Sequence, residues 1–109
     1  MRRISPIVVA ALFVALATGP ASASAKTVDV SIKNIDYSKR VVTIKRGDRV
    51  RWTWRDGSTP HDVTSKGSPR FKTSATKESG THVVTFRRAG TYRYVCSIHL
   101  NMRGRVVVR

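Results

Sequence analysis

This chain is organised around residues 90–102, which read Gly-Thr-Tyr-Arg-Tyr-Val-Cys-Ser-Ile-His-Leu-Asn-Met. Its first half alternates polar and apolar side chains, the period-two pattern of a β-strand with one face toward a core. Its second half offers a thiol, an imidazole and a thioether at Cys96, His99 and Met102. A thiolate, two imidazoles and a weak axial thioether form the ligand set of electron-transfer copper sites. His61 is the best candidate for the second imidazole.

The first 25 residues are typical of a secretory signal peptide. Two arginines precede an apolar run of 11 residues, and two overlapping small-x-small motifs follow in residues 21–25. An apolar run of this length is too short to span a bilayer as a helix. We expect cleavage after Ala25, with cleavage after Ala23 as the alternative. Residues 26–109 would then form one domain, in the periplasm or outside the cell.

The mature chain is strongly basic. Without the two arginines of the leader, 21 Lys and Arg residues become 19, against six Asp and Glu, a net charge of +13. Such a charge steers a protein toward anionic partners, and we expect an acidic redox protein such as a cytochrome or a dehydrogenase. The alternative is that the charge only solvates the surface, adapted to or associated with an anionic envelope. No nucleic-acid-binding motif is visible, and nothing in the sequence demands more than a monomer.

The single cysteine, Cys96, cannot form a disulfide within the chain. A free thiol in an oxidising compartment is a liability unless something occupies it, and a metal ion would do so. This argument for a metal site is independent of the ligand spacing.

Short β-like runs separated by turn residues fill the mature chain. The clearest run, residues 49–55, places Val50, Trp52 and Trp54 on one face and basic residues on the other. Further strands are expected at residues 28–33, 41–45, 81–87, 91–96 and 105–109. Residues 65–80 are polar and are expected to form a long loop that Phe71 pins to the core. Seven to eight short strands with regular turns predict an all-β fold, a Greek-key β-sandwich or barrel.

Three segments of the chain resemble the cupredoxin family, which contains the type 1, or blue, copper proteins. These segments are Val50–Asp56, Pro60–Val63 and Gly90–Val108. The tight Cys-x₂-His-x₂-Met loop is closer to the loop of amicyanin than to that of plastocyanin. The resemblance implies one copper ion per chain. It makes His61, Cys96 and His99 the strong ligands and Met102 the weak axial ligand.

The resemblance also assigns roles to the neighbours of these residues. His99 would be the port for electrons, within an apolar patch formed with Ile98 and Leu100. The family commonly has Asn after the first histidine, where this chain has Asp62. We expect the Asp62 carboxylate to accept a hydrogen bond from the Ser97 backbone, and its charge to favour Cu(II) and lower the reduction potential.

The function expected is an exported carrier of one electron that turns over no substrate. Storage or delivery of copper with the same ligands is one alternative. A basic, metal-free β-sandwich that binds anionic polymers or lipids is another. A structural zinc site fits less well because a thioether is a poor zinc ligand. Attached haem would need a Cys-x-x-Cys-His motif, which the chain lacks. His82, which lies outside the motif, is expected to be structural.

Overall fold

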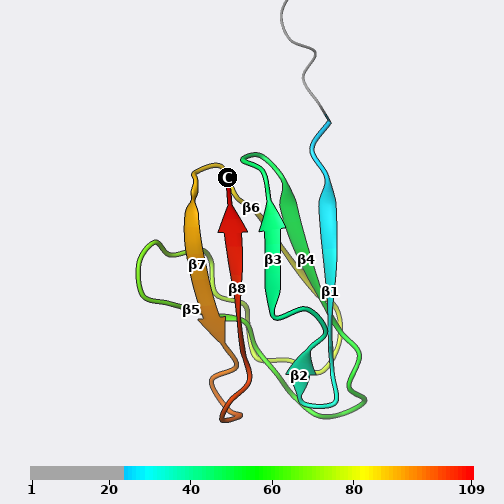
Figure 1. The fold of residues 1–109 in the computed structure, drawn as a ribbon. Helices are drawn as coiled ribbons and strands as arrows, with labels where there is room; N and C mark the ends of the chain where they lie inside the picture. Colours follow the sequence, from blue (N-terminus) through cyan, green and yellow to red (C-terminus); the bar gives the residue numbers. More distant parts are fainter. Residues whose placement is uncertain (1–23) are drawn as a thin grey trace, which may run out of the picture.

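The computed structural model describes residues 24–109 and shows two packed β-sheets (Figure 1). Apart from its last two residues, the expected signal peptide lies outside the described residues. In the described part of the chain, no helix is long and apolar enough to cross a membrane. The all-β fold predicted from the sequence is confirmed.

Within residues 24–109, eight strands form the two sheets. The first sheet contains, in spatial order, β2 (Asp36–Tyr37), β1 (Thr27–Lys33), β4 (Arg49–Trp54) and β6 (Thr81–Thr85). The second contains β3 (Val41–Ile44), β8 (Arg103–Val108), β7 (Gly90–Val95) and β5 (Thr64–Lys66). From β2 to β7 each connection crosses from one sheet to the other, as in the Greek-key sandwich that was predicted.

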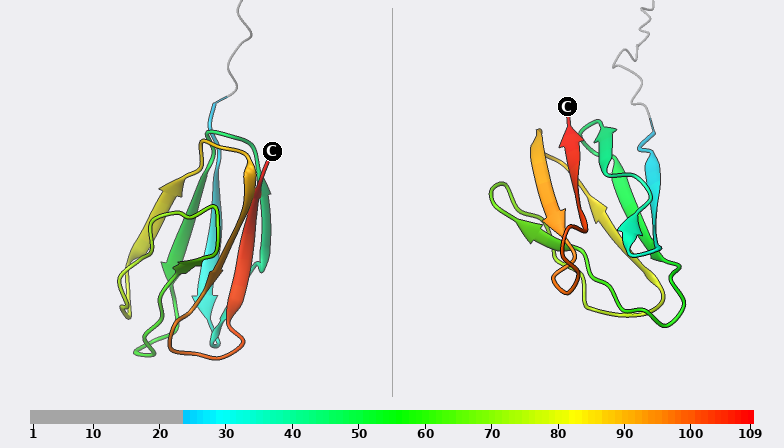
Figure 2. Two further views of the ribbon diagram at one scale, coloured as in Figure 1. Left: turned by 90° about the vertical axis from the view of Figure 1, so that its left-hand side faces the viewer. Right: turned by 60° about the horizontal axis from the view of Figure 1, so that its bottom comes forward.

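Parallel pairing fixes which loops meet at each end of the sandwich. β1 pairs in parallel with β4, and β3 with β8. The loop between β7 and β8 therefore lies at the end opposite the C-terminus, where the segment after β4 also emerges (Figures 1 and 2). Residues far apart in the sequence meet at this end.

The core between the sheets is built on aromatic side chains from the inward faces of the strands. Trp52 is fully buried and stacks on Phe71, with ring centroids 5.6 Å apart and planes 3° apart. Tyr94 from the opposite sheet meets Trp52 edge-on at 5.3 Å. Such aromatic contacts add to the free energy gained from burying the rings. The predicted inward face of residues 49–55 and the anchoring role of Phe71 are both confirmed.

The sequence did not predict two of the strands, β2 and β5. β5 lies in the segment expected to be a loop, and only its central residue, Ser65, is buried. It is a strand because it pairs with β7, through Thr64 opposite Val95, and not because of its own composition. The prediction of a loop over residues 65–80 was therefore wrong at its start.

Candidate metal centre

The loop that follows β7 holds three of the expected ligands at fixed positions. The Cys96 N–H donates to the Met102 carbonyl at 2.9 Å, and the Met102 N–H donates to the His99 carbonyl at 3.4 Å. Asn101 adopts a left-handed conformation, with φ at 67°, which lets the loop turn back into β8. Cys96 and Met102 are buried, whereas His99 is half-buried.

His61 reaches the same place from the segment that follows β4. Its N–H donates to the Lys77 carbonyl, and the Lys77 N–H donates back to the His61 carbonyl, each at 3.0 Å. The indole N–H of Trp54 donates to the same His61 carbonyl at 2.8 Å. The His61 backbone is thus held on two sides, and the side chain is 0% exposed.

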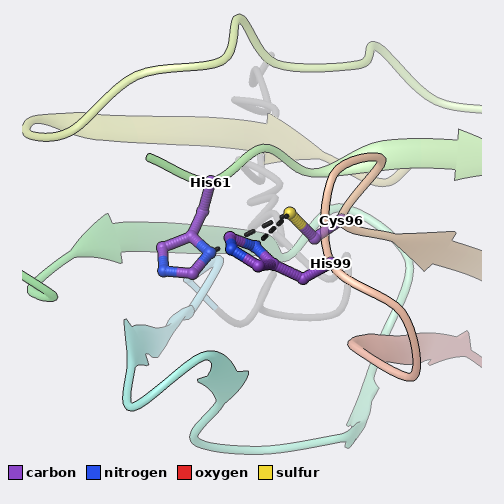
Figure 3. A group of neighbouring side chains, drawn as sticks. All are labelled: His61, Cys96 and His99. Carbon is purple, nitrogen blue, oxygen red and sulfur yellow. Dashed lines mark hydrogen bonds between the residues drawn. The ribbon is translucent and has the colours of Figure 1, made fainter. Parts of the chain in front are cut away.

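The thiol and the two imidazoles converge (Figure 3). Cys96 Sγ lies 3.9 Å from His61 Nδ1 and 3.4 Å from His99 Nδ1, and one ligand atom from each of the three residues lies within 4.8 Å of the other two. Three ligand atoms placed about 2.1 Å from a metal ion in one plane would lie about 3.6 Å apart. The three side chains therefore fit a metal ion with trigonal N,N,S coordination.

Met102 is buried at the end of the same loop, and its role as the axial ligand stays a prediction. Its side chain is 1% exposed, and it lines a cleft of about 270 Å³ together with Cys96 and His99. The thioether is therefore enclosed by protein and lies beside the same cleft as Cys96 and His99. His82 lies elsewhere, on β6, with Nε2 2.7 Å from the Lys72 carbonyl oxygen, in keeping with the structural role expected for it.

Asp62 ties the histidine segment to the cysteine loop. The Ser97 N–H donates to Asp62 Oδ1 at 2.8 Å, the hydrogen bond expected from the sequence, and the Ser97 hydroxyl donates to Oδ2. The hydroxyls of Thr64 and Thr76 also donate to this carboxylate. Burial alone would raise the pKa of Asp62, but the hydrogen bonds, led by those from Ser97, hold it below its usual value.

Asp56 is a site residue that sequence reasoning missed. Its Oδ2 lies 2.7 Å from Nε2 of His61, the ring nitrogen that points away from Cys96. The N–H groups of Asn34 and Ile35 donate to the same carboxylate, each at 3.0 Å. The bond to His61, followed by the bond from Ile35, lowers the pKa of Asp56. A carboxylate that accepts from one ring nitrogen leaves the other free to bind a metal ion. The sequence does show an acidic residue five positions before His61, but Asp56 precedes Gly57 and therefore looks like part of a turn.

Two exposed apolar residues flank His99 in the loop. Ile98 is 49% exposed and Leu100 is 94% exposed, so the loop presents a patch of the expected composition. Leu100 also lines the cleft over Cys96 and His99. An almost fully exposed leucine beside a half-buried imidazole is a surface suited to contact with another molecule.

Comparison with known proteins identifies the family to which this fold belongs. The family model described as cupredoxin-like domain matches residues 6–108. The chain belongs to the cupredoxin family. Among curated relatives of this cupredoxin, the amicyanin of Paracoccus versutus is 37% identical over 93 residues, which cover 81% of this chain and 69% of the relative. Amicyanin-alpha of Methylorubrum extorquens is 33% identical over 90 residues, covering 79% and 75% respectively.

Solved structures agree with the sequence relatives. A Cu(I) structure of an amicyanin with a methionine-to-glutamine substitution has a TM-score of 0.70 and 31% identity, and the match covers 76% of this cupredoxin and 82% of that chain. A reduced Cu(I) form of an amicyanin with a proline-to-glycine substitution has a TM-score of 0.69 and 30% identity, over 82% and 86%. The resemblance found in the sequence is confirmed, and it includes amicyanin.

Proposed function

We propose that this cupredoxin is an exported carrier of one electron. It binds a single copper ion through His61 Nδ1, Cys96 Sγ and His99 Nδ1, with the Met102 thioether as a weak axial ligand. Like its family, it works by binding and not by turning over a substrate. The observation that carries the proposal is the convergence of the three ligand atoms in a largely buried site.

The donor set selects the metal. Thiolate and thioether are soft ligands that favour copper, and a trigonal N,N,S site with a weak axial sulfur suits both Cu(I) and Cu(II). The amicyanin neighbours in the Cu(I) form support the same metal. A bound copper ion would supply the Cu(I)/Cu(II) couple.

The protein's own groups keep the ligands in place. Hydrogen bonds from Lys77 and Trp54 fix the His61 backbone, and Asp56 fixes its ring. Asp62 joins the two segments that carry the ligands. Electron transfer is fast when the ligands move little between the two oxidation states, and this frame limits their movement. The half-buried edge of His99, beside Ile98 and Leu100, offers a short route to a partner.

The visible and electron paramagnetic resonance spectra of the copper-loaded protein test this proposal. We expect an intense blue colour from the thiolate, a spectrum typical of a type 1 site, and reversible one-electron reduction. The variants Cys96→Ala and His61→Ala should remain folded and lose the colour. A cupric complex without an intense thiolate band would contradict the proposal.

Competition experiments separate the carrier from a copper-delivery protein. A carrier should keep its Cu(I) against a moderate excess of a Cu(I)-specific chelator and exchange electrons faster than metal. A delivery protein should lose the ion readily to the chelator. A metal-free binding module would take up no copper, and its affinity for anionic polymers would survive Cys96→Ala.

Export is the remaining part of the proposal. The basic start, the apolar run and the small-residue motifs of residues 1–25 support removal of a signal peptide after Ala25 and a periplasmic or extracellular location. Mass spectrometry of the protein recovered from the periplasm tests this, and a chain that still carries residue 1 would contradict it. Gel filtration at micromolar concentration should show a monomer.

A further inference from the structure

Four cations share the outward face of the second sheet. Lys66 on β5 lies opposite Arg93 on β7, and Arg93 lies opposite Arg105 on β8. Arg103 is two residues before Arg105 on the same strand, so its side chain points to the same face. The inward neighbours of Arg93 are the buried Tyr92 and Tyr94. We call Lys66, Arg93, Arg103 and Arg105 the basic face.

No acidic side chain neutralises the basic face within residues 24–109. The Arg and Lys ion pairs of the described chain lie elsewhere, between Arg51 and Asp29 and between Arg40 and Asp36. Like charges directly opposite each other across paired strands destabilise a sheet. The row of Lys66, Arg93 and Arg105 therefore costs the free protein stability, and a negatively charged partner would offset that cost.

The basic face continues into the electron port. Its four cations line an open cleft of about 570 Å³, whose edge is formed by Arg40, the partner of Asp36. A second cleft, of about 270 Å³, reaches Cys96, His99 and Leu100. Both clefts are lined by Lys66, Val95 and Arg103. One continuous surface thus leads from the charged sheet to the exposed Leu100 and the half-buried His99.

We propose that the basic face and Leu100 together form the docking surface for an acidic electron-transfer protein. The partner lies against the side of the second sheet, with acidic groups over Arg93 and Arg105 and its redox centre beside His99. One electron then passes: copper goes from Cu(I) to Cu(II) as the partner's oxidised centre gains that electron. This inference rests on the proposed function and specifies which of the many cations serve it.

Two triple variants with the same change in charge test the docking surface. The near variant carries Lys66→Gln, Arg93→Gln and Arg105→Gln. The far variant carries Lys45→Gln, Arg87→Gln and Arg88→Gln, exposed residues at the opposite end of the sandwich. The probe is hexacyanoferrate(III), an anionic one-electron oxidant, mixed with the Cu(I) protein by stopped flow at low ionic strength.

The near variant should react about tenfold more slowly than the wild type, and the far variant less than about twofold more slowly. The difference should shrink as added salt screens the charges. Equal effects of the two variants would overturn the docking surface. So would a near variant that weakens binding to phosphatidylglycerol-containing vesicles yet leaves the oxidation rate unchanged, since the face would then serve a membrane.

A redox-inert anion separates failure of this inference from failure of the proposed function. Hexacyanochromate(III) is paramagnetic and broadens the amide signals of nearby residues in a nuclear magnetic resonance spectrum. In the Cu(I) protein, broadening should concentrate on β5, β7 and β8. Broadening elsewhere overturns the docking surface even if the protein is blue and reversible. A protein that never becomes blue overturns the function, wherever the anion binds.

A different observation, at the far end of the sandwich, concerns the expected cleavage site. The Lys26 N–H donates to Asp48 Oδ1 at 3.0 Å, and the Lys45 N–H donates to Oδ2 at 3.0 Å. The Lys26 carbonyl accepts from the Arg49 N–H at 2.8 Å. Asp48 is 9% exposed. Its carboxylate thus accepts, in a nearly buried place, from the nitrogen that cleavage after Ala25 would convert to an ammonium group.

We infer that the Asp48 carboxylate binds the new N-terminal ammonium group of the exported chain. Cleavage after Ala25 replaces an amide donor with a charged one, and charge-assisted hydrogen bonds are roughly twice as strong. Asp48 lines a cleft together with four basic side chains, those of Lys26, Lys45, Arg46 and Arg109, and it is the only acidic side chain that lines this cleft within residues 24–109. Processing would therefore stabilise the mature fold. This inference rests on the proposed export and not on copper.

The test compares the exported protein with a chain that carries one extra alanine before Lys26, which moves the ammonium group away from Asp48. The pKa of the paired ammonium group should lie above its unfolded value of about 7.7–8.0, so its stabilisation is complete below pH 7 and is lost as the pH rises through the folded pKa. At pH 6 the exported protein should melt about 4 °C higher, and the gap should close near pH 9.5. Asp48→Asn should close the gap at both pH values. A gap that persists in Asp48→Asn, or no gap at pH 6, would overturn the inference.

Discussion

Asp62 places a negative charge next to the proposed copper site, at a position where an amide would make similar hydrogen bonds. In Asp62→Asn the remaining oxygen can still accept from the Ser97 N–H and the Thr64 hydroxyl, and the amide NH₂ can donate to the hydroxyl oxygens of Ser97 and Thr76, while the charge is removed. Because a nearby anion favours Cu(II), we expect the reduction potential to rise by on the order of tens of millivolts. Protein-film voltammetry measures this, with Asp29→Asn on the exposed face of β1 as a control of equal charge. An unchanged or lower potential in Asp62→Asn would remove the explanation.

Asp56 is expected to position His61, because it binds the ring nitrogen opposite the one that faces Cys96. Asp56→Ala should lower the affinity for Cu(I) by about 10- to 100-fold, as is common when such partners of metal ligands are lost. A chelator competition measures the affinity, and the visible spectrum reports whether the site geometry changes with it. Asp29→Ala, which also removes a carboxylate, is the control. Unchanged affinity in Asp56→Ala would mean that the backbone contacts alone hold His61.

These two aspartates differ in how visible they were in the sequence. The proposed ligands could be picked out because thiol, imidazole and thioether are rare donors that stand close together in one loop. Asp62 was noticed because it follows His61 directly. Asp56 precedes a glycine and looks like a turn former, and only the folded backbone shows that its carboxylate reaches His61 Nε2.

At the scale of strands, predictions succeeded where a strand carries its own pattern. β4 alternates cleanly, so its inward face was predicted correctly. β5 has no apolar alternation and exists through its pairing with β7, which no local pattern reveals. Two-residue β2 is likewise defined by its partner, since it forms only through pairing with β1.

The contact between β7 and β8 depends on one glycine. Gly104 lies opposite Tyr94, and a Cβ at this position would come within 2.5 Å of the Tyr94 oxygen and 2.6 Å of Tyr94 Cζ. Gly104→Ala must therefore displace the ring, and we expect a loss of about 1–3 kcal/mol in the free energy of unfolding, measured by urea denaturation. Because the Tyr94 hydroxyl is buried without a hydrogen-bond partner, Tyr94→Phe alone should cost little. Because Phe keeps Cζ, Gly104→Ala should still be destabilising in the Tyr94→Phe background, and a Gly104→Ala protein as stable as the wild type would contradict the steric explanation.

At the scale of the whole molecule, the sequence could predict a net charge but not its distribution. The basic face exists because the register of three strands brings Lys66, Arg93 and Arg105 into one row. Lys66 belongs to a strand that was not predicted, so the row was invisible before the structure. The meeting of His61 with the Cys96 loop, by contrast, followed from the Greek-key topology, since that topology joins distant strand ends at one end of the sandwich.

The same architecture predicts how the protein behaves without metal. The ligands are held by contacts that need no ion, such as the bonds between His61 and Lys77, Asp62 and Ser97, and Cys96 and Met102. In small zinc domains the metal supplies most of the folding free energy, whereas this chain has one continuous core of aliphatic and aromatic side chains. The copper-free protein should therefore keep its β-sheet circular dichroism and unfold cooperatively.

Copper should then stabilise a fold that already exists. Because the ion binds the folded chain, a concentration of 100 times the dissociation constant adds about 2.7 kcal/mol, which should raise the melting temperature by on the order of 10 °C. Calorimetry of the copper-free and copper-loaded proteins measures this shift. In Cys96→Ala the copper-dependent shift should shrink strongly while the copper-free melting temperature changes little, because the substitution removes one ligand atom from an otherwise intact frame. A copper-free chain without cooperative unfolding would show instead that the metal organises the two sheets, and that the site is not preassembled.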